Sequence, residues 1–315
     1  MKNNRLAIIV PCYFEEDVLP STIESLRKIL GDLKSEGRIS QDSFIFFVDD
    51  GSKDDTWKII TETAATNHEV KGIRLSRNFG HQHALLAGMH NIKDEVDIAV
   101  TIDADLQDNP VVIRDMVDKY HEGANIVYAV RNNRDTDSFF KRFTAHAFYN
   151  LMKFMKVQTI YNHADFRLID RHILRSLYDF REVHLFLRGM FPLIGFEKAV
   201  VYYRRDKRLA GETKYPLGKM MAFAWDGISS FSTFPLRLIF YIGIIMFLIS
   251  FVLVIWALIP FVQGKAIPGW ASTVVPFFMF SGLQSVFLGI IGEYLGKIYG
   301  EIKARPRYII SERIN

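Results

Sequence analysis

The chain reads Ile98-Ala99-Val100-Thr101-Ile102-Asp103-Ala104-Asp105-Leu106-Gln107 at the point that decides its fold. The first five residues are apolar or β-branched and do not alternate with polar ones, which is typical of a strand buried on both faces of a parallel sheet. Ligands of open parallel sheets bind outside the carboxyl ends of the strands. We therefore expect Asp103 and Asp105 to project into a ligand-binding crevice.

Similar apolar runs flank this stretch and alternate with helix-like segments. The predicted strands are Leu6–Val10, Phe44–Val48, Gly72–Leu75, Ile98–Ile102 and Ile126–Ala129. The predicted helices are Leu19–Leu33, Thr56–Thr66, His81–Asn91 and Pro110–His121. This alternation predicts an α/β fold with a mostly parallel sheet covered by helices on both faces. The three-glycine dinucleotide fingerprint is absent after the first strand, which argues against a nicotinamide or flavin enzyme.

Acidic residues follow three of these strands. Glu15 comes just after the first strand, Asp49-Asp50-Gly51-Ser52 after the second and Asp103 and Asp105 after the fourth. A carboxylate after the second strand can accept hydrogen bonds from uracil N3 or ribose hydroxyls, although this tetrapeptide could also be a simple turn with a helix cap. Oxygen ligands from Asp103, Asp105 and Gln107 suit Mg²⁺ or Mn²⁺ bridging a diphosphate. Three acidic strand ends in order favour a site over solvated turns.

The apolar content of the 315 residues is concentrated toward the end of the chain. The runs 238–262 and 266–292 contain no charged residue, and each exceeds the roughly 20 residues that a membrane-spanning helix needs. They predict two spans, at about 237–262 and 271–292. Buried core helices are the alternative.

The basic residues predict the orientation of this hairpin. Arg237 precedes the first span and five Lys or Arg residues follow the second, whereas the connection 263–270 holds only Lys265. By the positive-inside rule both chain ends are cytoplasmic. No secretory signal is visible near Met1, and the lone Cys12 agrees with a reducing compartment. The net charge of +4 is better explained by membrane lipid than by nucleic acid.

Two further stretches have an amphipathic, aromatic character. Residues 139–155 place Phe and Met at helical spacing with Lys141, Arg142 and Lys153 between them, and residues 220–234 lead into the first span. Such helices suit a membrane interface, although an ordinary helix packed on the sheet remains the alternative for the first. The predicted organisation is a catalytic domain at 1–215, a juxtamembrane helix at 216–235, a membrane hairpin at 236–292 and a basic cytoplasmic tail at 293–315.

Several motifs together carry a resemblance to a known family. They are Pro11…Glu15-Glu16, Asp49-Asp50-Gly51-Ser52, Ser76-Arg77-Asn78-Phe79-Gly80, Asp103-Ala104-Asp105-Leu106-Gln107, Asp165-Phe166-Arg167-Leu168 and Gly211-Glu212-Thr213-Lys214. The pattern resembles family 2 glycosyltransferases that use polyprenyl phosphates, a group related to dolichyl-phosphate mannose synthase. Residues 226–237, the two spans and the tail Arg305-Pro306-Arg307-Tyr308-Ile309-Ile310 are similar to the bactoprenol glucosyltransferases in particular.

This resemblance implies a GT-A (Rossmann-like) domain that transfers a hexose from a UDP-sugar, with UDP-glucose the best guess and N-acetylglucosamine or galactose behind it. The acceptor would be undecaprenyl or another polyisoprenyl phosphate, and the reaction would invert the anomeric centre. The enzyme would lie in the bacterial cytoplasmic membrane as a homo-oligomer, a tetramer by family resemblance. A processive polysaccharide synthase lacks support because its Gln-x-x-Arg-Trp motif is absent. A catalytically silent nucleotide-sugar-binding scaffold is the remaining alternative.

The resemblance also assigns the site residues. The nucleotide would be held by Pro11, Tyr13, Glu15, Asp49, Asp50, Arg77 and Asp103, and the metal by Asp103, Asp105 and Gln107. Arg208 and Lys214 would act in catalysis on a mobile loop, where their charge meets the growing charge of the diphosphate. Arg167, Arg204 and Arg205 would bind the acceptor phosphate, although the basic residues at 204–208 could instead form a lipid-headgroup patch. The chain departs from many relatives at Phe14, where they have Asn.

Asp165 has two possible roles. The family counterpart is often described as a catalytic base, yet a phosphate monoester is already largely dianionic at neutral pH because its second pKa is about 6. We therefore favour a positioning role toward Arg167 or the sugar hydroxyls. His81 and His83 are expected in the opening turn of a helix near the nucleotide rather than in a zinc site.

Overall fold

The computed structural model describes residues 3–131, 163–182, 187–204, 236, 238–246, 248–249, 252 and 269–314. The chain forms two compact units. One contains Met1–Lys153, Gln158–Pro216 and Arg305–Asn315, and the other contains Phe154–Val157 and Leu217–Ala304.

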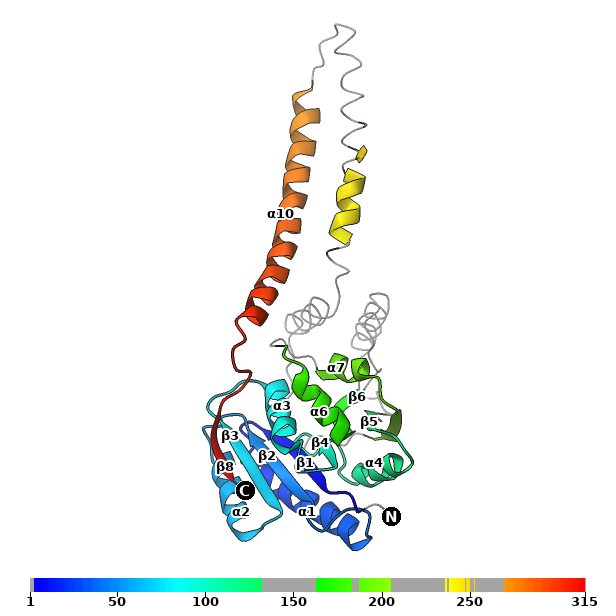
Figure 1. The fold of residues 1–315 in the computed structure, drawn as a ribbon. Coiled ribbons are helices and arrows are strands. Elements are labelled where there is room, and N and C mark those ends of the chain that lie inside the picture. The colour runs from blue at the N-terminus through cyan, green and yellow to red at the C-terminus, as the bar shows by residue number, and fades with distance from the viewer. Residues whose placement is uncertain are drawn as a thin grey trace. The chain divides into compact units, whose positions relative to one another are not determined.

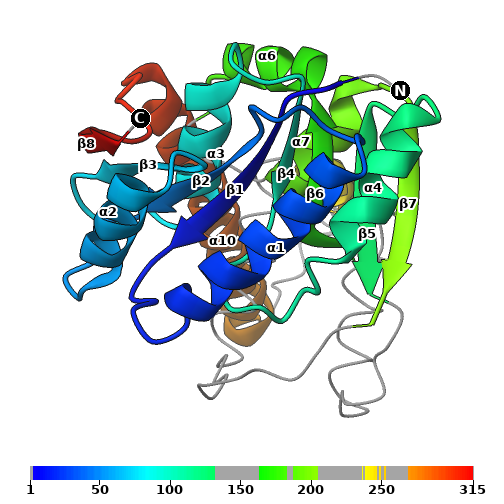
Figure 2. The same cartoon turned by 90° about the horizontal axis from the view of Figure 1, so that it is seen from below.

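The first unit is built on an eight-stranded sheet in the order β7-β5-β6-β4-β1-β2-β3-β8. The strands are β1 (Leu6–Cys12), β2 (Phe44–Asp49), β3 (Val70–Leu75), β4 (Ile98–Thr101), β5 (Ile126–Arg131), β6 (His163–Asp170), β7 (Lys198–Tyr203) and β8 (Ile310–Ile314). Strands β1, β2, β3 and β4 are mutually parallel, as are β5 and β7. β6 and β8 run antiparallel to their neighbours. Figure 2 shows β7 and β8 at opposite edges of the sheet.

The predicted strands and helices of the first 131 residues are confirmed. The helices are α1 (Leu19–Ser35), α2 (Thr56–Thr66), α3 (His81–Ile92) and α4 (Val112–His121). No boundary differs from the expected one by more than two residues; for example, β3 begins at Val70 rather than Gly72, and Pro110 precedes α4 instead of opening it. β3 extends back to Val70 because this residue is itself apolar and buried.

Helices cover the sheet on both faces, as Figure 1 shows. α1 contacts α2 and α4 on one face, whereas α3 packs on β1 and β2 and contacts α6 (Arg171–Asp179) on the other. All residues of β1 and β2 are buried, which explains their continuous apolar sequence. The core between the sheet and α1 includes Ile8, Val10, Leu26 and Leu30. β1 and β2, neither of which has an exposed face, thus hold their carboxyl ends in place, and the site is built from these ends.

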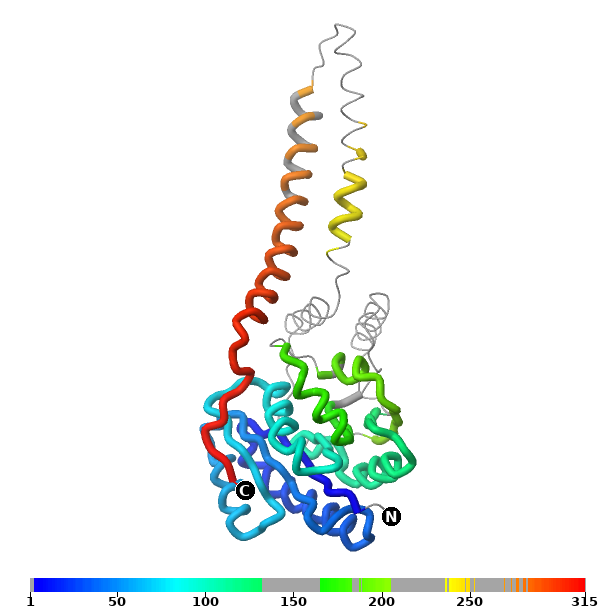
Figure 3. The backbone as a smooth tube through the Cα atoms, viewed as in Figure 1, coloured from blue at the N-terminus to red at the C-terminus, as the bar shows by residue number. Residues whose placement is uncertain are grey.

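The C-terminal segment differs from the expected tail. Helix α10 (Trp270–Ile302) extends ten residues past the predicted end of the second span at 292, and the chain then adds β8 to the sheet next to β3. Figure 3 traces the residues after α10 along the sheet unit to Ile314. Residues 305–315 therefore belong to the same compact unit as the first 153 residues.

The membrane predictions fall largely outside the described residues. This applies to the amphipathic stretches 139–155 and 216–235 and to most of the span 237–262. Among the residues that the structure describes, no helix combines the length and the apolar character that crossing a membrane requires. The hairpin and its orientation stay predictions.

Candidate active site

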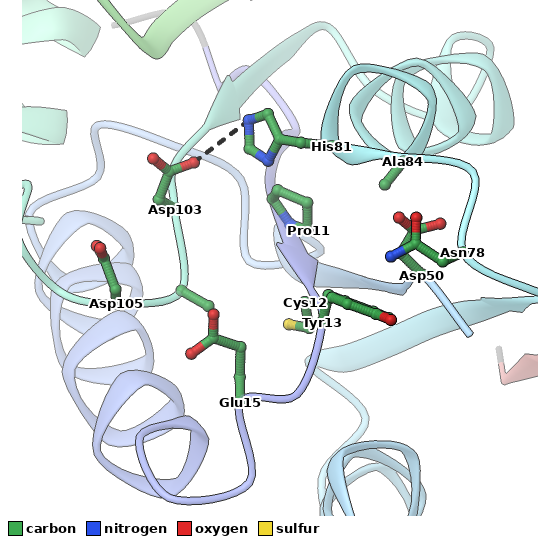
Figure 4. Close-up of a pocket in the computed structure, with 11 residues that line it drawn as sticks. Pro11, Cys12, Tyr13, Glu15, Asp50, Asn78, His81, Ala84, Asp103 and Asp105 are labelled. Carbon is green, nitrogen blue, oxygen red and sulfur yellow. Dashed lines mark ion pairs between the residues drawn. The ribbon is translucent and has the colours of Figure 1, made fainter. Parts of the chain in front are cut away.

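A pocket of about 260 Å³ opens at the carboxyl ends of β1, β2 and β4 (Figure 4). Its walls come from the end of β1, the turn after β2, the start of α3 and the loop after β4. The lining residues are Pro11, Cys12, Tyr13, Glu15, Asp50, Asn78, His81, Ala84, Asp103, Ala104 and Asp105. The structure thus brings together acids from three strand ends, as the sequence predicts for a parallel sheet.

Asp50 is held in the pocket wall by the backbone of the next loop. Its two carboxylate oxygens accept hydrogen bonds from the N–H groups of Phe79, at 2.8 Å, and Gly80, at 2.9 Å. Burial raises the pKa of the Asp50 carboxyl, and these two amides oppose that shift. Asp50 therefore ties the turn after β2 to the start of α3 as well as lining the pocket.

Asp49, the other acid of this turn, does not line the pocket. Its side chain is fully shielded from water, accepts a hydrogen bond from the Ser52 N–H at 3.0 Å and pairs with Arg74 Nε at 3.2 Å. Adjacent residues at the end of a strand point to opposite sides, so only one of the two acids can face the crevice. The predicted nucleotide contact of Asp49 is not supported by this placement.

The turn itself requires Gly51. Its φ of +71° lies in the left-handed region, and a Cβ here would come within 2.5 Å of the backbone carbonyl carbon of Arg77. The Arg77 guanidinium stacks over the Phe79 ring, 3.9 Å from its centroid, and does not line the pocket. Arg77 thus serves the turn through its backbone, while its neighbour Asn78 reaches the pocket.

The loop after β4 presents two of the three predicted metal ligands. Asp103 and Asp105 line the pocket, whereas Gln107 is buried beside it, only 3% exposed. Leu106 has a φ of +53°, and this left-handed residue allows the Gln107 N–H to donate to Asp105 Oδ1 at 3.2 Å. Burial raises the pKa of the Asp103 carboxyl, and nearby His81 opposes this rise without cancelling it.

These residues fit a divalent cation that is shared with a substrate. Within the described ranges, no three His, Cys, Asp or Glu side chains are grouped so that they could enclose a metal ion by themselves. Mg²⁺ commonly binds through one or two carboxylates together with substrate phosphates. The two carboxylates of Asp103 and Asp105 in one pocket meet that requirement.

A buried polar cluster that the sequence reasoning missed anchors this loop. Asp108 accepts two hydrogen bonds from Arg131 Nη2, at 3.1 and 3.2 Å, and a short one from the Tyr203 hydroxyl. Arg131 Nε donates to the same hydroxyl at 3.0 Å. The cluster links the acidic loop to the ends of β5 and β7. A third acid directly after Gln107 was the only signal of it in the sequence.

Asp165 lies in β6, next to β4, and behind the pocket wall in the sense that it does not line the pocket but contacts His81, which does. It forms a buried ion pair with Arg167, whose guanidinium lies 4.4 Å from the centroid of the Phe191 ring. The Thr101 hydroxyl donates to the Asp165 carbonyl at 2.6 Å, which fixes β6 beside β4. This geometry fits the favoured positioning role. It does not place Arg167, only 1% exposed, where an acceptor phosphate could reach it directly.

His81 connects this pair to the pocket. Its Nε2 lies 3.6 Å from Asp103 Oδ1 and 3.7 Å from Asp165 Oδ2, and Figure 4 shows the first of these contacts. The expectation that His81 sits in the opening turn of a helix is confirmed, since α3 begins there. Among the basic residues predicted to bind phosphate, Arg204 is exposed just after β7. Arg205, Arg208 and Lys214 lie outside the described residues.

Comparisons with known proteins agree with this picture. The family model described as Glycosyl transferase family 2 matches residues 7–178. The Bacillus subtilis (strain 168) protein named Uncharacterized glycosyltransferase YkoT is 50% identical over 305 residues, covering 97% of this chain and 90% of its own. The Bactoprenol glucosyl transferase of Shigella phage SfX is 37% identical over 311 residues, covering 98% of this chain and 99% of its own.

Among solved structures, glucosyl-3-phosphoglycerate synthase from Mycobacterium tuberculosis, in complex with Mn²⁺, UDP and phosphoglyceric acid, has a TM-score of 0.45 at 17% identity. The match covers 70% of this chain and 75% of that one.

The mostly parallel sheet and the acids at its strand ends fit a glycosyltransferase of the GT-A type. The family match, and the relatives that align over nearly the whole chain, identify the family of this enzyme. The chain belongs to glycosyl transferase family 2.

Proposed function

We propose that this enzyme transfers a hexose, with UDP-glucose as the best candidate donor, to the phosphate of undecaprenyl or another polyisoprenyl lipid. The observation that carries the proposal is the convergence on one pocket of acids from three strand ends, namely Glu15 after β1, Asp50 after β2, and Asp103 and Asp105 after β4. The relatives named bactoprenol glucosyl transferase, aligned over 98% of this chain, support the acceptor and the sugar. UDP-N-acetylglucosamine and UDP-galactose are the alternative donors.

The donor binds in the pocket, with its nucleotide against Pro11, Tyr13, Glu15 and Asp50. Tyr13 is half-exposed and offers a ring face on which a base can stack. Asp103 and Asp105 would hold Mg²⁺ or Mn²⁺, with Gln107 next to them. When bound, the cation would supply positive charge to neutralise the leaving diphosphate.

The reaction is a single displacement that inverts the anomeric carbon. A phosphate oxygen of the lipid forms a bond to C1 of the sugar, and the bond from C1 to the β-phosphate oxygen breaks, so that UDP leaves. Arg204, Arg205, Arg208 and Lys214 supply positive charge for the incoming phosphate and the departing diphosphate. Asp165 positions Arg167 behind the pocket wall, with base catalysis as its alternative role.

The acceptor is a membrane lipid, and we propose that the chain is anchored in the bacterial cytoplasmic membrane by a hairpin, with its catalytic unit in the cytoplasm. The support is the pair of uncharged runs, 238–262 and 266–292, both of which include residues outside the described part. On α10, apolar side chains such as Phe277, Leu288 and Leu295 are more than half exposed, as a lipid-facing helix requires. A homo-oligomer, a tetramer by family resemblance, is part of the same proposal.

Protease protection tests the topology. Tags at Met1 and Asn315 should be protected in sealed cells, whereas a tag inserted after Gly264 should be cleaved. Cleavage of the Asn315 tag alone would contradict the hairpin.

The function is tested with the full chain in lipid nanodiscs that contain undecaprenyl phosphate. Each radiolabelled UDP-sugar is supplied separately, with Mn²⁺ or with chelator. We expect one UDP-hexose, UDP-glucose first, to label the lipid in the presence of the cation. Binding of UDP-sugar without transfer to lipid or water would instead identify a silent scaffold.

A further inference from the structure

The last residues of the chain form part of the sheet that carries the donor pocket. β8 pairs antiparallel with β3, and the Ser76 N–H donates to the Ile309 carbonyl at 2.9 Å to extend this pairing. Nothing from β8 lines the pocket. Its polar sequence, Ile310-Ser311-Glu312-Arg313-Ile314, is that of an exposed edge strand. Its side chains also contact β3 and a neighbouring helix.

Glu312 is a residue of β8 whose side chain contacts both a helix and the neighbouring strand. Its Oε2 accepts a hydrogen bond from Trp57 Nε1 at 3.0 Å, and its Oε1 accepts one from Arg74 Nη1 at 3.0 Å. The hydrogen bonds from Trp57 and Arg74 lower the pKa of the Glu312 carboxyl. Two partners from α2 and β3 thus hold one ionised carboxylate in a defined position.

Arg74 continues this chain of contacts to the turn after β2. Its Nε pairs with Asp49 Oδ2 at 3.2 Å, and its Nη2 donates to the Ser52 carbonyl at 2.9 Å. The planar guanidinium therefore binds Glu312, Asp49 and Ser52 through three separate nitrogens, which a lysine could not reproduce. Because Asp49 is fully buried, the position of this cation matters to the turn.

The turn that Arg74 holds is the one that carries Asp50. Ser52 closes the turn through its N–H to Asp49, and its hydroxyl accepts from the N–H of Phe14, next to Tyr13 in the pocket wall. Both sides of the nucleotide end of the pocket therefore depend on the same turn.

We infer that Glu312 and Arg74 are positioning residues for the nucleotide: the C-terminal strand orients Arg74, and Arg74 holds the Asp49–Ser52 turn in the shape that binds the UDP moiety. This inference rests on the proposed function. It makes donor affinity depend on a residue near the end of the chain that touches no substrate.

Other contacts of the C-terminal segment provide a matched control. Arg313, the residue after Glu312, donates to the side chain of Asn91 at the far end of α3. Arg313→Gln weakens the docking of the same strand without touching Arg74 or the turn.

The experiment measures UDP binding by calorimetry, and donor KM and kcat for transfer, with the full-length chain in nanodiscs. Glu312→Gln should raise the UDP Kd and the donor KM about threefold, as expected for a partly exposed charged contact. Arg74→Lys should raise both about tenfold or more. The double variant should be no worse than Arg74→Lys alone, because both changes act through one guanidinium. In each case kcat and acceptor KM should stay within about twofold of wild type, and Arg313→Gln should bind UDP normally.

Each other outcome overturns the inference. Unchanged UDP affinity in Glu312→Gln, or an equal loss in Arg313→Gln, would show that β8 only stabilises the sheet edge. Multiplicative losses in the double variant would show that the two residues act separately. A wild-type chain that binds no UDP would overturn the proposed function as well, which separates the two failures.

Discussion

Asp165 and Arg167 form an ion pair on β6 in which the side chains are only 6% and 1% exposed. Breaking a buried pair by removing one partner typically costs about 3–5 kcal/mol, because the remaining charge is uncompensated. The pair lies behind the pocket wall and reaches it through His81. Its effect on the reaction is therefore expected to be indirect.

A double-mutant cycle on this pair separates positioning from base catalysis. Asp165→Asn and Arg167→Gln should each lower transfer by about 10²-fold. The double variant should lose no more than either single one and should melt at a higher temperature than both, since no unpaired charge remains. An independent base at Asp165 would make the two losses multiply.

The proposed metal site gives a second prediction. Asp105→Ala should lower transfer by about 10²-fold or more while leaving the melting temperature of the sheet unit unchanged, because Asp105 lines the pocket and not the core. Asp115→Ala, which removes an exposed acid in the first turn of α4, is the control. Near-normal turnover of Asp105→Ala in excess chelator would refute the assignment.

Phe14 provides a prediction about stability. Its φ of +56° is unfavourable for a bulky residue, by about 1–2 kcal/mol, and its half-exposed ring recovers little by contact with Tyr13. Phe14→Asn should therefore raise the free energy of unfolding by up to about 1 kcal/mol, because Asn tolerates the left-handed region. Phe14→Ala removes the ring but keeps a residue that disfavours the left-handed region, so the free energy of unfolding of this variant should not rise above that of wild type. Equal stabilities for the two variants would exclude backbone strain as the cause.

His90 predicts how stability depends on pH. Burial, with Arg307 and Lys93 nearby, lowers the pKa of its imidazole to about 4 from the ordinary 6.5. Between these values the unfolded chain binds more protons, so the free energy of unfolding falls as the pH drops from about 6.5 toward 4, by at most about 1.4 kcal/mol per pH unit. The His90 ring contacts Tyr178 of α6 and Tyr308 of the C-terminal segment. Protonation of His90 is therefore expected to weaken the docking of the C-terminal segment.

Thermal melts across this range test the His90 prediction. His90→Asn should have a shallower slope than wild type, whereas His172→Asn, on an exposed position of α6, should not. Parallel slopes for wild type and His90→Asn would contradict the prediction.

The parts of the fold that the sequence predicts well are those with unbroken apolar runs. β1, β2 and β4 are buried on both faces, so their sequence carries no competing signal. β6 is not predicted by its sequence because charged residues such as Asp165 and Arg167 are typical of loops. They are tolerated in this buried strand because they neutralise each other. β8 is not predicted because Ser311, Glu312 and Arg313 are polar, and because its partner β3 lies more than two hundred residues earlier in the sequence.

The pocket could be predicted to the level of the strand end but not of the side chain. Asp49 and Asp50 are chemically identical and adjacent, and only the strand geometry decides that Asp50 lines the pocket. In the same way, nothing local in the sequence distinguishes Asp108, which anchors the loop through Arg131 and Tyr203, from the acids before it.

Transfer of label to lipid tests the central claim most directly. The full-length chain in nanodiscs receives UDP-[¹⁴C]glucose and Mn²⁺, with undecaprenyl phosphate, undecaprenyl diphosphate or no acceptor, and label is measured in the organic phase and as free sugar. The account predicts label in the organic phase only with undecaprenyl phosphate, as a product one hexose heavier than the acceptor, and about 10²-fold less or lower still after Asp105→Ala. Label that appears only as free glucose, or equally with every acceptor, would contradict it.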